Sequence, residues 1–415
     1  MKKVVLYILI FAIFVSCSKD NRSIDKVDMV LTKAQAEYVF AGNDLGFKLF
    51  KALDNVDTES KLLSPLCVQS VLSMLVAGAD GNTADEIVSV MGFGDDAKET
   101  VSYLSSLTRQ MKLLDRKTDF SIANAMLVNS ASGAKIMSSY TDVLSLYQDA
   151  NVFSYDFISE KEKASEAINK WTSDHTSGII PSLIGSPSEL LPTYVAVLWS
   201  ALLFKSSWAL PFNPQLTVNQ EFFPYQRVST YIPMMHQTAM FDYYEDSEKQ
   251  ALTMKYGNGA YCFTAILPRG DFSLSDLVEV IDGEIFREIK QKSVQTNVNV
   301  CIPSFIKEMD LDLKPLLKFS GINEAFSGDA NFGKLAEPAT GIHISKTMQK
   351  TYIRVNESGS EAASATRIDL DVAGSPDESS NSSKVFNANH PFLYLISESS
   401  SSSVIFIGSF TGTDM

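Results

Sequence analysis

The sequence predicts an α+β fold in which helices surround a large, mostly antiparallel central sheet. The chain has 415 residues, of which 45% are hydrophobic, and this is enough to bury a large core. Segments with helical periodicity lie before residue 175, whereas segments rich in β-branched and aromatic residues follow Tyr194. The two kinds of segment do not alternate regularly, which favours an antiparallel sheet over a parallel one.

Two segments near the start of the chain have the spacing of helices. Apolar residues recur at helical spacing from Ala34 to Leu53. Ser64 is expected to cap a second helix, with Pro65 just inside its start. This helix, Leu66–Ala77, is apolar on nearly every face. We therefore expect the rest of the protein to surround it.

Two further helices follow. Thr83 is expected to cap a short helix over Ala84–Met91. The segment Glu162–Asp174 is amphipathic. Its buried face is predicted to carry Ala167, Ile168 and Trp171.

The second half of the chain contains segments with the composition of strands. They are rich in β-branched and aromatic residues and are bounded by turn-forming residues. Two of them, near the C-terminus, are separated by a serine-rich turn and predict a buried hairpin. The predicted strands are Tyr194–Phe204, Tyr261–Leu267, Val298–Ile302, Tyr352–Val355, Pro391–Ser397 and Val404–Phe410.

The charge of the chain excludes one large class of partner. Lysine and arginine number 35 and aspartate and glutamate 49, which gives a net charge of −14. A protein this acidic is poorly suited to hold phosphate backbones, so nucleic acid is not expected as a partner. Four cysteines in 415 residues are too few for a scaffold held together by disulfides.

The N-terminus has the pattern of a secretory signal. Lys2 and Lys3 precede a short apolar run that ends at Val15, and Cys17 follows. The pattern resembles a bacterial lipoprotein signal, in which residues 1–16 are removed and Cys17 is acylated. An N-terminal membrane helix is the alternative, but the run is too short to span a bilayer. We therefore expect a lipid-anchored flexible tether over residues 17–33.

This reading predicts a location for the protein. It would be secreted across the inner membrane and held in the bacterial envelope, at the outer membrane or cell surface. No later segment is apolar enough to span a membrane, so the lipid is expected to be the sole membrane contact.

Motifs of common enzymes are absent from the sequence. There is no Gly-x-Ser-x-Gly, His-Glu-x-x-His, Walker loop or Gly-x-Gly-x-x-Gly. The four histidines lie far apart without carboxylates at ligand spacing, and Cys67, Cys262 and Cys301 sit within apolar runs. The sequence therefore predicts neither catalysis nor a metal or other cofactor.

Residues 357–385 form a long connection between two strand-like segments. Connections longer than about 12–15 residues are uncommon in compact domains unless they are functional or disordered. From residue 360 to 372 one face is small and then apolar, whereas the other is charged or small, as in a strand. An acidic surface linker is the simpler alternative. The first face carries Ser360, Ala362, Ser364, Thr366, Ile368, Leu370 and Val372, and the second carries Glu361, Ala363, Ala365, Arg367, Asp369 and Asp371.

Short motifs in a fixed order run through most of the chain after the predicted tether. Each is weak alone, and their shared order over some 350 residues resembles the serpin family. They are Ser64-Pro65-Leu66, Gly78-Ala79, Gly81-Asn82-Thr83, Asn169-x-Trp171, Thr176-x-Gly178, Ile180, Phe204-Lys205-x-x-Trp208, Pro211-Phe212, Met234-Met235, Ile266-Leu267-Pro268, the run from Asn356 to Thr366, His390-Pro391-Phe392 and Phe406-x-Gly408.

The resemblance implies one serpin-type domain over residues 34–415, with an exposed reactive-centre loop over residues 357–385. It also implies a suicide-substrate inhibitor of serine endopeptidases, with cysteine endopeptidases as a second class, and not an enzyme. In this family the protease cuts the loop, and the loop then inserts into the main sheet as a strand and traps the acyl-enzyme. We expect a monomer whose partner is the target endopeptidase.

The resemblance assigns roles to residues of the loop. Its hinge comprises Glu357, Gly359, Ser360, Glu361, Ala362, Ala363, Ser364, Ala365 and Thr366. The family's spacing places the cut after the seventeenth residue counted from Glu357, which is the bond Ala373–Gly374, with Val372 as the alternative. Alanine there suits an elastase-like or subtilisin-like protease.

The resemblance also implies a polar network that controls the opening of the main sheet. Ser64 and Asn124 match the family, whereas Cys67 replaces a serine, Ser200 an asparagine and Gln349 a histidine. Two alternatives to an inhibitor remain open. One is a non-inhibitory serpin fold that serves as a surface binding protein. The other is an unrelated surface lipoprotein that binds glycans or peptides.

Overall fold

The computed structural model describes residues 26–53, 55–93, 97–148, 150–338, 342–344, 347–360 and 383–412. The predicted signal and Cys17 lie outside the described residues. So do the hinge residues Glu361 to Thr366 and the predicted bait residues Val372, Ala373 and Gly374.

Helices and strands alternate irregularly along the chain. The helices are α1 (Lys33–Lys51), α2 (Pro65–Gly78), α3 (Gly81–Met91), α4 (Ala97–Met111), α5 (Ser138–Gln148), α6 (Lys161–His175), α7 (Leu274–Val280), α8 (Gly283–Lys292) and α9 (Leu313–Ser320), with short 3₁₀ turns η1 (Pro187–Glu189), η2 (Pro214–Leu216) and η3 (Glu324–Phe326). The strands are β1 (Leu62–Leu63), β2 (Asp119–Asn129), β3 (Lys135–Ile136), β4 (Ala150–Tyr155), β5 (Ala196–Ser207), β6 (Val218–Phe222), β7 (Thr230–Glu245), β8 (Lys249–Tyr256), β9 (Tyr261–Pro268), β10 (Val294–Pro303), β11 (Phe305–Asp312), β12 (Ala336–Glu337), β13 (Met348–Asn356), β14 (Gly359–Ser360), β15 (Lys384–Asn387), β16 (Phe392–Glu398) and β17 (Val404–Phe410).

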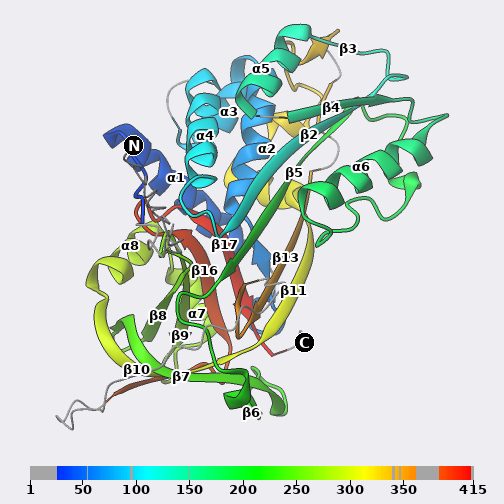
Figure 1. The fold of residues 1–415 in the computed structure, drawn as a ribbon. Coiled ribbons are helices and arrows are strands. Elements are labelled where there is room, and N and C mark those ends of the chain that lie inside the picture. The colour runs from blue at the N-terminus through cyan, green and yellow to red at the C-terminus, as the bar shows by residue number, and fades with distance from the viewer. Residues whose placement is uncertain are drawn as a thin grey trace, which may run out of the picture.

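Two large sheets organise the fold. A six-stranded sheet has the order β11-β13-β14-β5-β2-β4, and only its β2–β4 pair is parallel. A nine-stranded sheet has the order β1-β17-β16-β9-β8-β7-β10-β15, with β6 paired to β7. Helices α2 to α5 gather at one end of the molecule, and β6 lies at the other (Figure 1). The predicted α+β fold with a mostly antiparallel sheet is confirmed.

Helix α2 runs through the centre of the protein, as its apolar sequence predicts. Ser64 accepts a hydrogen bond from the backbone of Cys67, and Pro65 occupies the first turn. Every residue of α2 except Ala77 is buried. Helix α1 and the hairpin β16–β17 were also predicted correctly.

Two details of the predicted helices were wrong. Helix α3 begins at Gly81, so Thr83 lies inside it and does not cap it. The buried Thr83 hydroxyl instead donates to Glu324 and accepts a hydrogen bond from the backbone of Asn331. In α6 the half-buried Ala167 lies beside the buried face, which Ala164, Ile168 and Trp171 form.

The central strands β2 and β5 are buried on both faces. Leu202 and Phe204 of β5 belong to the main core, between the two sheets. Trp199 and Ala201 of the same strand belong to a second, smaller core beneath α6. There Trp199 packs edge-on against Trp171 of α6, with ring centroids 5.6 Å apart. None of the helices in the described part of the chain is long and apolar enough to cross a membrane.

Candidate functional site

The start of the predicted reactive-centre loop already forms part of the six-stranded sheet. The two-residue strand β14 pairs on one side with β13, through Val355 and Ser360, and on the other with β5, through Ser360 and Ser206. Both pairings are antiparallel. Within the described residues no ladder joins β5 directly to β13. We call the line along which these two strands face each other the central boundary.

Gly359 is required by the close approach of β14 to β5. Its φ is +150°, and a Cβ atom added there would lie 2.1 Å from the backbone oxygen of Ser206. Real Cβ atoms do not approach so closely, so any side chain would displace the strand. The strand β14 therefore fits between its neighbours only because residue 359 is glycine.

Ser360 points from β14 into the core between the two sheets. Its side chain is 1% exposed, and its hydroxyl lies 2.5 Å from that of Tyr256 on β8. The ring of Tyr256 stacks on Trp208, with centroids 4.4 Å apart. Burial raises the pKa of Tyr256 well above its usual range, so the phenol stays neutral. A small polar residue thus occupies an enclosed position where a larger one would not fit.

The turn before β14 is fixed by contacts with distant parts of the chain. The Asn356 carbonyl accepts a hydrogen bond of 2.8 Å from the indole of Trp208. The Asn356 side chain accepts from the backbone of Ser358 and Gly359. Glu357 accepts from the hydroxyl of Thr217 at 2.7 Å. These contacts hold the base of the loop in one conformation.

Further along the central boundary, Gln349 of β13 bonds to the start of α2. Its side-chain oxygen accepts from the backbone N–H of Ser64, and its nitrogen donates to the Ser64 carbonyl, both at 2.9 Å. The Ser64 hydroxyl donates to the carbonyl of Ile405 on β17. A glutamine amide can make this paired contact because it carries both a donor and an acceptor.

The other predicted members of the network lie close by. Asn124 and Ser200 are register partners on β2 and β5. Burial raises the pKa of the Cys67 thiol to about 11, and the hydroxyls of Ser64 and Ser200 lie near enough to oppose that rise. The structure thus brings together Ser64, Cys67, Ser200 and Gln349, with Asn124 adjacent.

Replacing Gln349 with alanine is expected to destabilise the protein by about 2–4 kcal/mol, because the buried N–H and C=O of Ser64 lose their partners. Urea unfolding of the purified protein measures the change. Ser200→Ala is the matched control. Its hydroxyl makes no hydrogen bond of standard geometry with the described residues, so the loss should stay below about 1 kcal/mol. Equal losses in the two variants would contradict the assignment.

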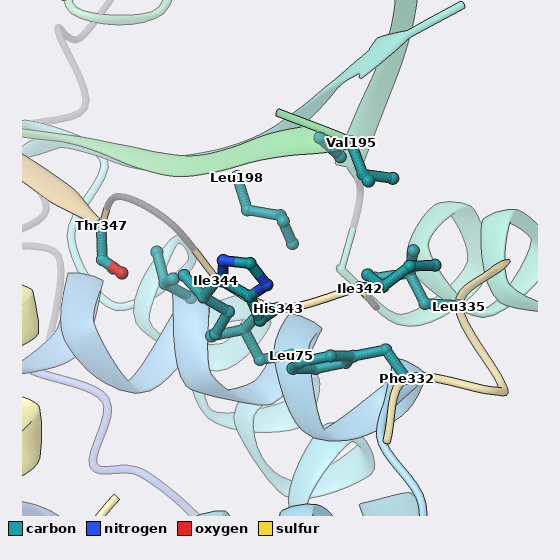
Figure 2. A pocket seen from close by; sticks show the side chains of 11 residues that line it. Leu75, Val195, Leu198, Phe332, Leu335, Ile342, His343, Ile344 and Thr347 are labelled. Carbon is teal, nitrogen blue, oxygen red and sulfur yellow. The ribbon is translucent and has the colours of Figure 1, made fainter. Parts of the chain in front are cut away.

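A hollow of about 30 Å³ lies at the far end of the central boundary. Leu198 of β5 points into it from the sheet, and His343, Leu75 of α2 and Phe332 lie across from Leu198 (Figure 2). Thr347, just before β13, also lines it. Its hydroxyl is buried and makes no hydrogen bond with the described residues.

The other end of the loop is anchored by a short strand and an ion pair. Strand β15 pairs in parallel with β10 over four residues. Its first residue, Lys384, contacts Glu245 at the end of β7, 2.5 Å away. Glu245 also accepts from Tyr243 at 2.7 Å, and Lys384 is the main cause of the lowered pKa of Glu245.

Several residues at this site were not predicted from the sequence. Tyr256, Thr217 and Glu245 lie more than 100 residues from the loop positions they contact, and no local pattern marks them. Trp208 belongs to the motif Phe204-Lys205-x-x-Trp208, but the motif does not indicate its contact with the base of the loop.

Known proteins resemble this chain over nearly its whole length. The family model described as Serpin (serine protease inhibitor) matches residues 40–412. Intracellular coagulation inhibitor 2 of Tachypleus tridentatus is 31% identical over 374 residues, which cover 89% of each chain. The native thermophilic serpin tengpin superposes with a TM-score of 0.81 at 24% identity, covering 93% of this chain and 96% of that one. Human thyroxine-binding globulin does so with a TM-score of 0.81 at 24% identity, covering 92% of this chain and all of the other.

Proposed function

The chain belongs to the serpin family, and from that membership we propose that it is a suicide-substrate inhibitor of endopeptidases. The protease would cut the reactive-centre loop and form an acyl bond to it. The freed loop would then insert as a strand between β5 and β13 and carry the protease with it. On this proposal each molecule of the protein reacts with one protease molecule and is used up, so the protein is not an enzyme.

One observation carries the proposal: Ser360 is already paired with both β13 and β5. Insertion of the loop would extend an existing short strand and would not have to nucleate a new one. Both strands are long enough to continue the pairing, because β5 runs back to Ala196 and β13 to Met348. The hinge is therefore poised at the start of the central boundary.

Continuing this register gives each inserted residue a position. Six residues on, Thr366 would come opposite Gln349 and Ser200, which belong to the predicted sheet-opening network. Eight residues on, Ile368 would come opposite Thr347 and Leu198. Those two residues line the hollow at the far end of the boundary. An aliphatic side chain would thus reach the hollow just where space exists for it.

The side chains on this face suit such a path. Ala362 and Ser364, which would follow Ser360, are small and would pass between packed strands with little resistance. Ile368, Leu370 and Val372 come later, and burial of all three would contribute about 5–9 kcal/mol. New sheet hydrogen bonds add about 0.5–1.5 kcal/mol each. The inserted form would therefore be much more stable than the uncut one.

The proposal extends to the target and the location. We propose that Ala373–Gly374 is the bait bond, that the target is elastase-like or subtilisin-like, and that the protein acts as a monomer. We also propose that Cys17 carries a lipid that holds the protein in the bacterial envelope. Mass spectrometry of the N-terminal peptide tests the last point, because an unmodified Cys17 or an intact signal would contradict it.

Incubation with proteases tests the inhibitory function. The purified protein is mixed with pancreatic elastase, a subtilisin or trypsin, and the products are examined by denaturing gel and mass spectrometry. We expect elastase or subtilisin to give a covalent adduct that survives denaturation, with a released peptide that begins at Gly374. Trypsin is expected to cut after Arg367 without an adduct, because too little of the loop would then insert. Cleavage by every protease without an adduct or added heat stability would favour the non-inhibitory alternative.

Glu245→Gln is expected to increase, by up to about fivefold, the rate at which the uncut protein loses activity on storage. Without the ion pair to Lys384, β15 would separate from β10 more often, and the uncut loop could insert. The pKa of Glu245 in the folded protein lies below its unfolded value of 4.5, so the ionised carboxylate stabilises the fold at pH values above 4.5. This contribution is lost as the pH falls through the lowered value, so acid should accelerate inactivation of the wild type more than of the variant.

Inhibitory activity measured over days at pH 7 and pH 4 provides the test. Glu248→Gln removes a nearby carboxylate that forms no ion pair with Lys384, and it serves as the control. Equal decay of all three proteins would mean that β15 is not held by this contact.

A further inference from the structure

A cavity of about 340 Å³ lies on the nine-stranded sheet, away from the central boundary. It is bounded by β7, β8 and β9, by the end of α8 and by the turn between β16 and β17. Three of its lining residues are lysines, although the whole chain carries a net charge of −14. They are Lys26, Lys255 and Lys290.

Lys26 pairs with Asp28 and Lys255 with Asp242, whereas Lys290 forms no ion pair with the described residues. Its ammonium group donates to the backbone carbonyl of Ser399 at 3.1 Å and lies 5.8 Å from the ring of Phe286. Among the described residues no carboxylate lies within ion-pair distance of it. By contrast Lys292, two residues on along α8, pairs with Glu288 and is 63% exposed. An ammonium group can donate three hydrogen bonds, so two of those of Lys290 are left for a ligand.

The acidic groups around the cavity are already engaged. Asp242 pairs with Lys255 at 3.4 Å and also accepts from Gln295. Glu398 is fully buried, and it accepts four hydrogen bonds from Ser400 and Ser401. Neither carboxylate is therefore available to complete the surroundings of Lys290.

The other groups near Lys290 reinforce this picture. Burial lowers the pKa of Lys290, because the charged form is poorly solvated there. Cys262, Glu398 and Asp242 oppose this lowering of the pKa, whereas Lys26, which pairs with Asp28 at 2.8 Å, adds to it. An anion in the cavity would supply the solvation that the ammonium group lacks.

We propose that this cavity binds a phosphate group, either as inorganic phosphate or as the monoester of a small metabolite. Lys290 would donate its free N–H groups to the phosphate oxygens, and Lys255 of β8, which pairs with Asp242, would add a second ammonium group to the lining. A compact dianion suits this arrangement, because lysine binds phosphate as a point charge. The volume is sufficient for an ester the size of glycerol phosphate. The site is independent of the proposed inhibitory function.

Isothermal titration calorimetry of the full chain at pH 7 and constant ionic strength tests the proposal. Inorganic phosphate, glycerol 3-phosphate and acetate are titrated separately. We expect saturable binding of one phosphate or phosphate monoester per chain and much weaker binding of acetate. Tighter binding of glycerol 3-phosphate than of phosphate would identify an ester as the ligand, and the reverse order would identify the free ion.

Two variants on the same helix separate the site from general surface charge. Lys290→Met is expected to weaken phosphate binding about tenfold or more, the equivalent of one charged hydrogen bond. Lys292→Met removes the same charge from an exposed position and should leave the affinity within about twofold. Equal effects of the two variants, or titrations that do not saturate, would overturn the proposal.

Two more variants distinguish loss of the binding site from loss of the fold. Lys290→Arg keeps the charge and should retain most of the affinity, while Lys255→Met removes the second ammonium group of the lining, leaves Asp242 unpaired, and should weaken binding. Circular dichroism confirms that each variant is folded. Unchanged affinity in folded Lys290→Met and Lys255→Met proteins would also overturn the assignment.

Discussion

Replacing Ser360 with arginine is expected to convert the protein from an inhibitor into a substrate, with a loss of covalent trapping of about 100-fold or more. Ser360 is 1% exposed between β13 and β5, beside Tyr256. An arginine would keep residue 360 out of the sheet in the uncut protein, and burying its unpaired guanidinium when the loop inserts would cost about 3–5 kcal/mol. A 100-fold change in rate requires about 2.7 kcal/mol. Insertion of the loop would be slowed, so the acyl bond would be hydrolysed and the protease released before the loop could trap it.

The measurement is the number of inhibitor molecules consumed per protease molecule trapped, together with the yield of adduct on a denaturing gel. Cleavage at the bait bond should persist in the variant. Glu361→Arg is the matched control, because the alternating pattern places residue 361 on the solvent face, and it should trap as well as the wild type. Full trapping by Ser360→Arg would show that insertion does not pass through this position.

Cleavage of the loop by elastase or subtilisin is expected to raise the melting temperature of the protein by roughly 20 °C or more. Burial of Ile368, Leu370 and Val372 contributes about 5–9 kcal/mol, and the new sheet hydrogen bonds could double that. In a domain of this size each kcal/mol shifts the melting temperature by roughly 2 °C. Calorimetry or circular dichroism of the cut and uncut proteins provides the comparison.

The cut Ser360→Arg protein is the control for this experiment. Its loop should insert more slowly and gain about 3–5 kcal/mol less, so its melting temperature should rise less than that of the cut wild type, by roughly 6–10 °C. If cutting the wild type leaves the melting temperature unchanged, the loop does not insert, and the inhibitory proposal fails. If melting rises without any adduct, the loop inserts but too slowly to trap a protease.

The elements predicted correctly are those that residues close together in the sequence determine. Helix α2 has a proline in its first turn and an unbroken apolar run, and both its position and its burial were predicted. The hairpin β16–β17 was predicted because its strands are apolar and its turn is rich in serine. Thr83 was misassigned because its hydroxyl bonds to Glu324 and Asn331, which are distant in sequence. Strands β2 and β7 were not predicted at all.

The site could be predicted only in part. The alternating pattern marked the loop, and the face of Ser360 that it indicated does point into the core. The resemblance named Ser64 and Gln349, but the paired contact between them depends on the fold. Tyr256 and the hollow beside Thr347 arise where separate elements meet, and local periodicity carries no information on such positions. The roles of the network and the bait bond stay predictions.

The second core beneath α6 has a mechanical consequence. Strands β2, β4 and β5 share that core with α6 and pack through residues such as Trp171 and Trp199. Strands β11 and β13 contribute nothing to it. The six-stranded sheet therefore has two halves that share the main core, and only the half formed by β2, β4 and β5 is also attached to α6. Moving the other half sideways, as the proposed insertion requires, would leave the core beneath α6 intact and would need sliding only at the main core.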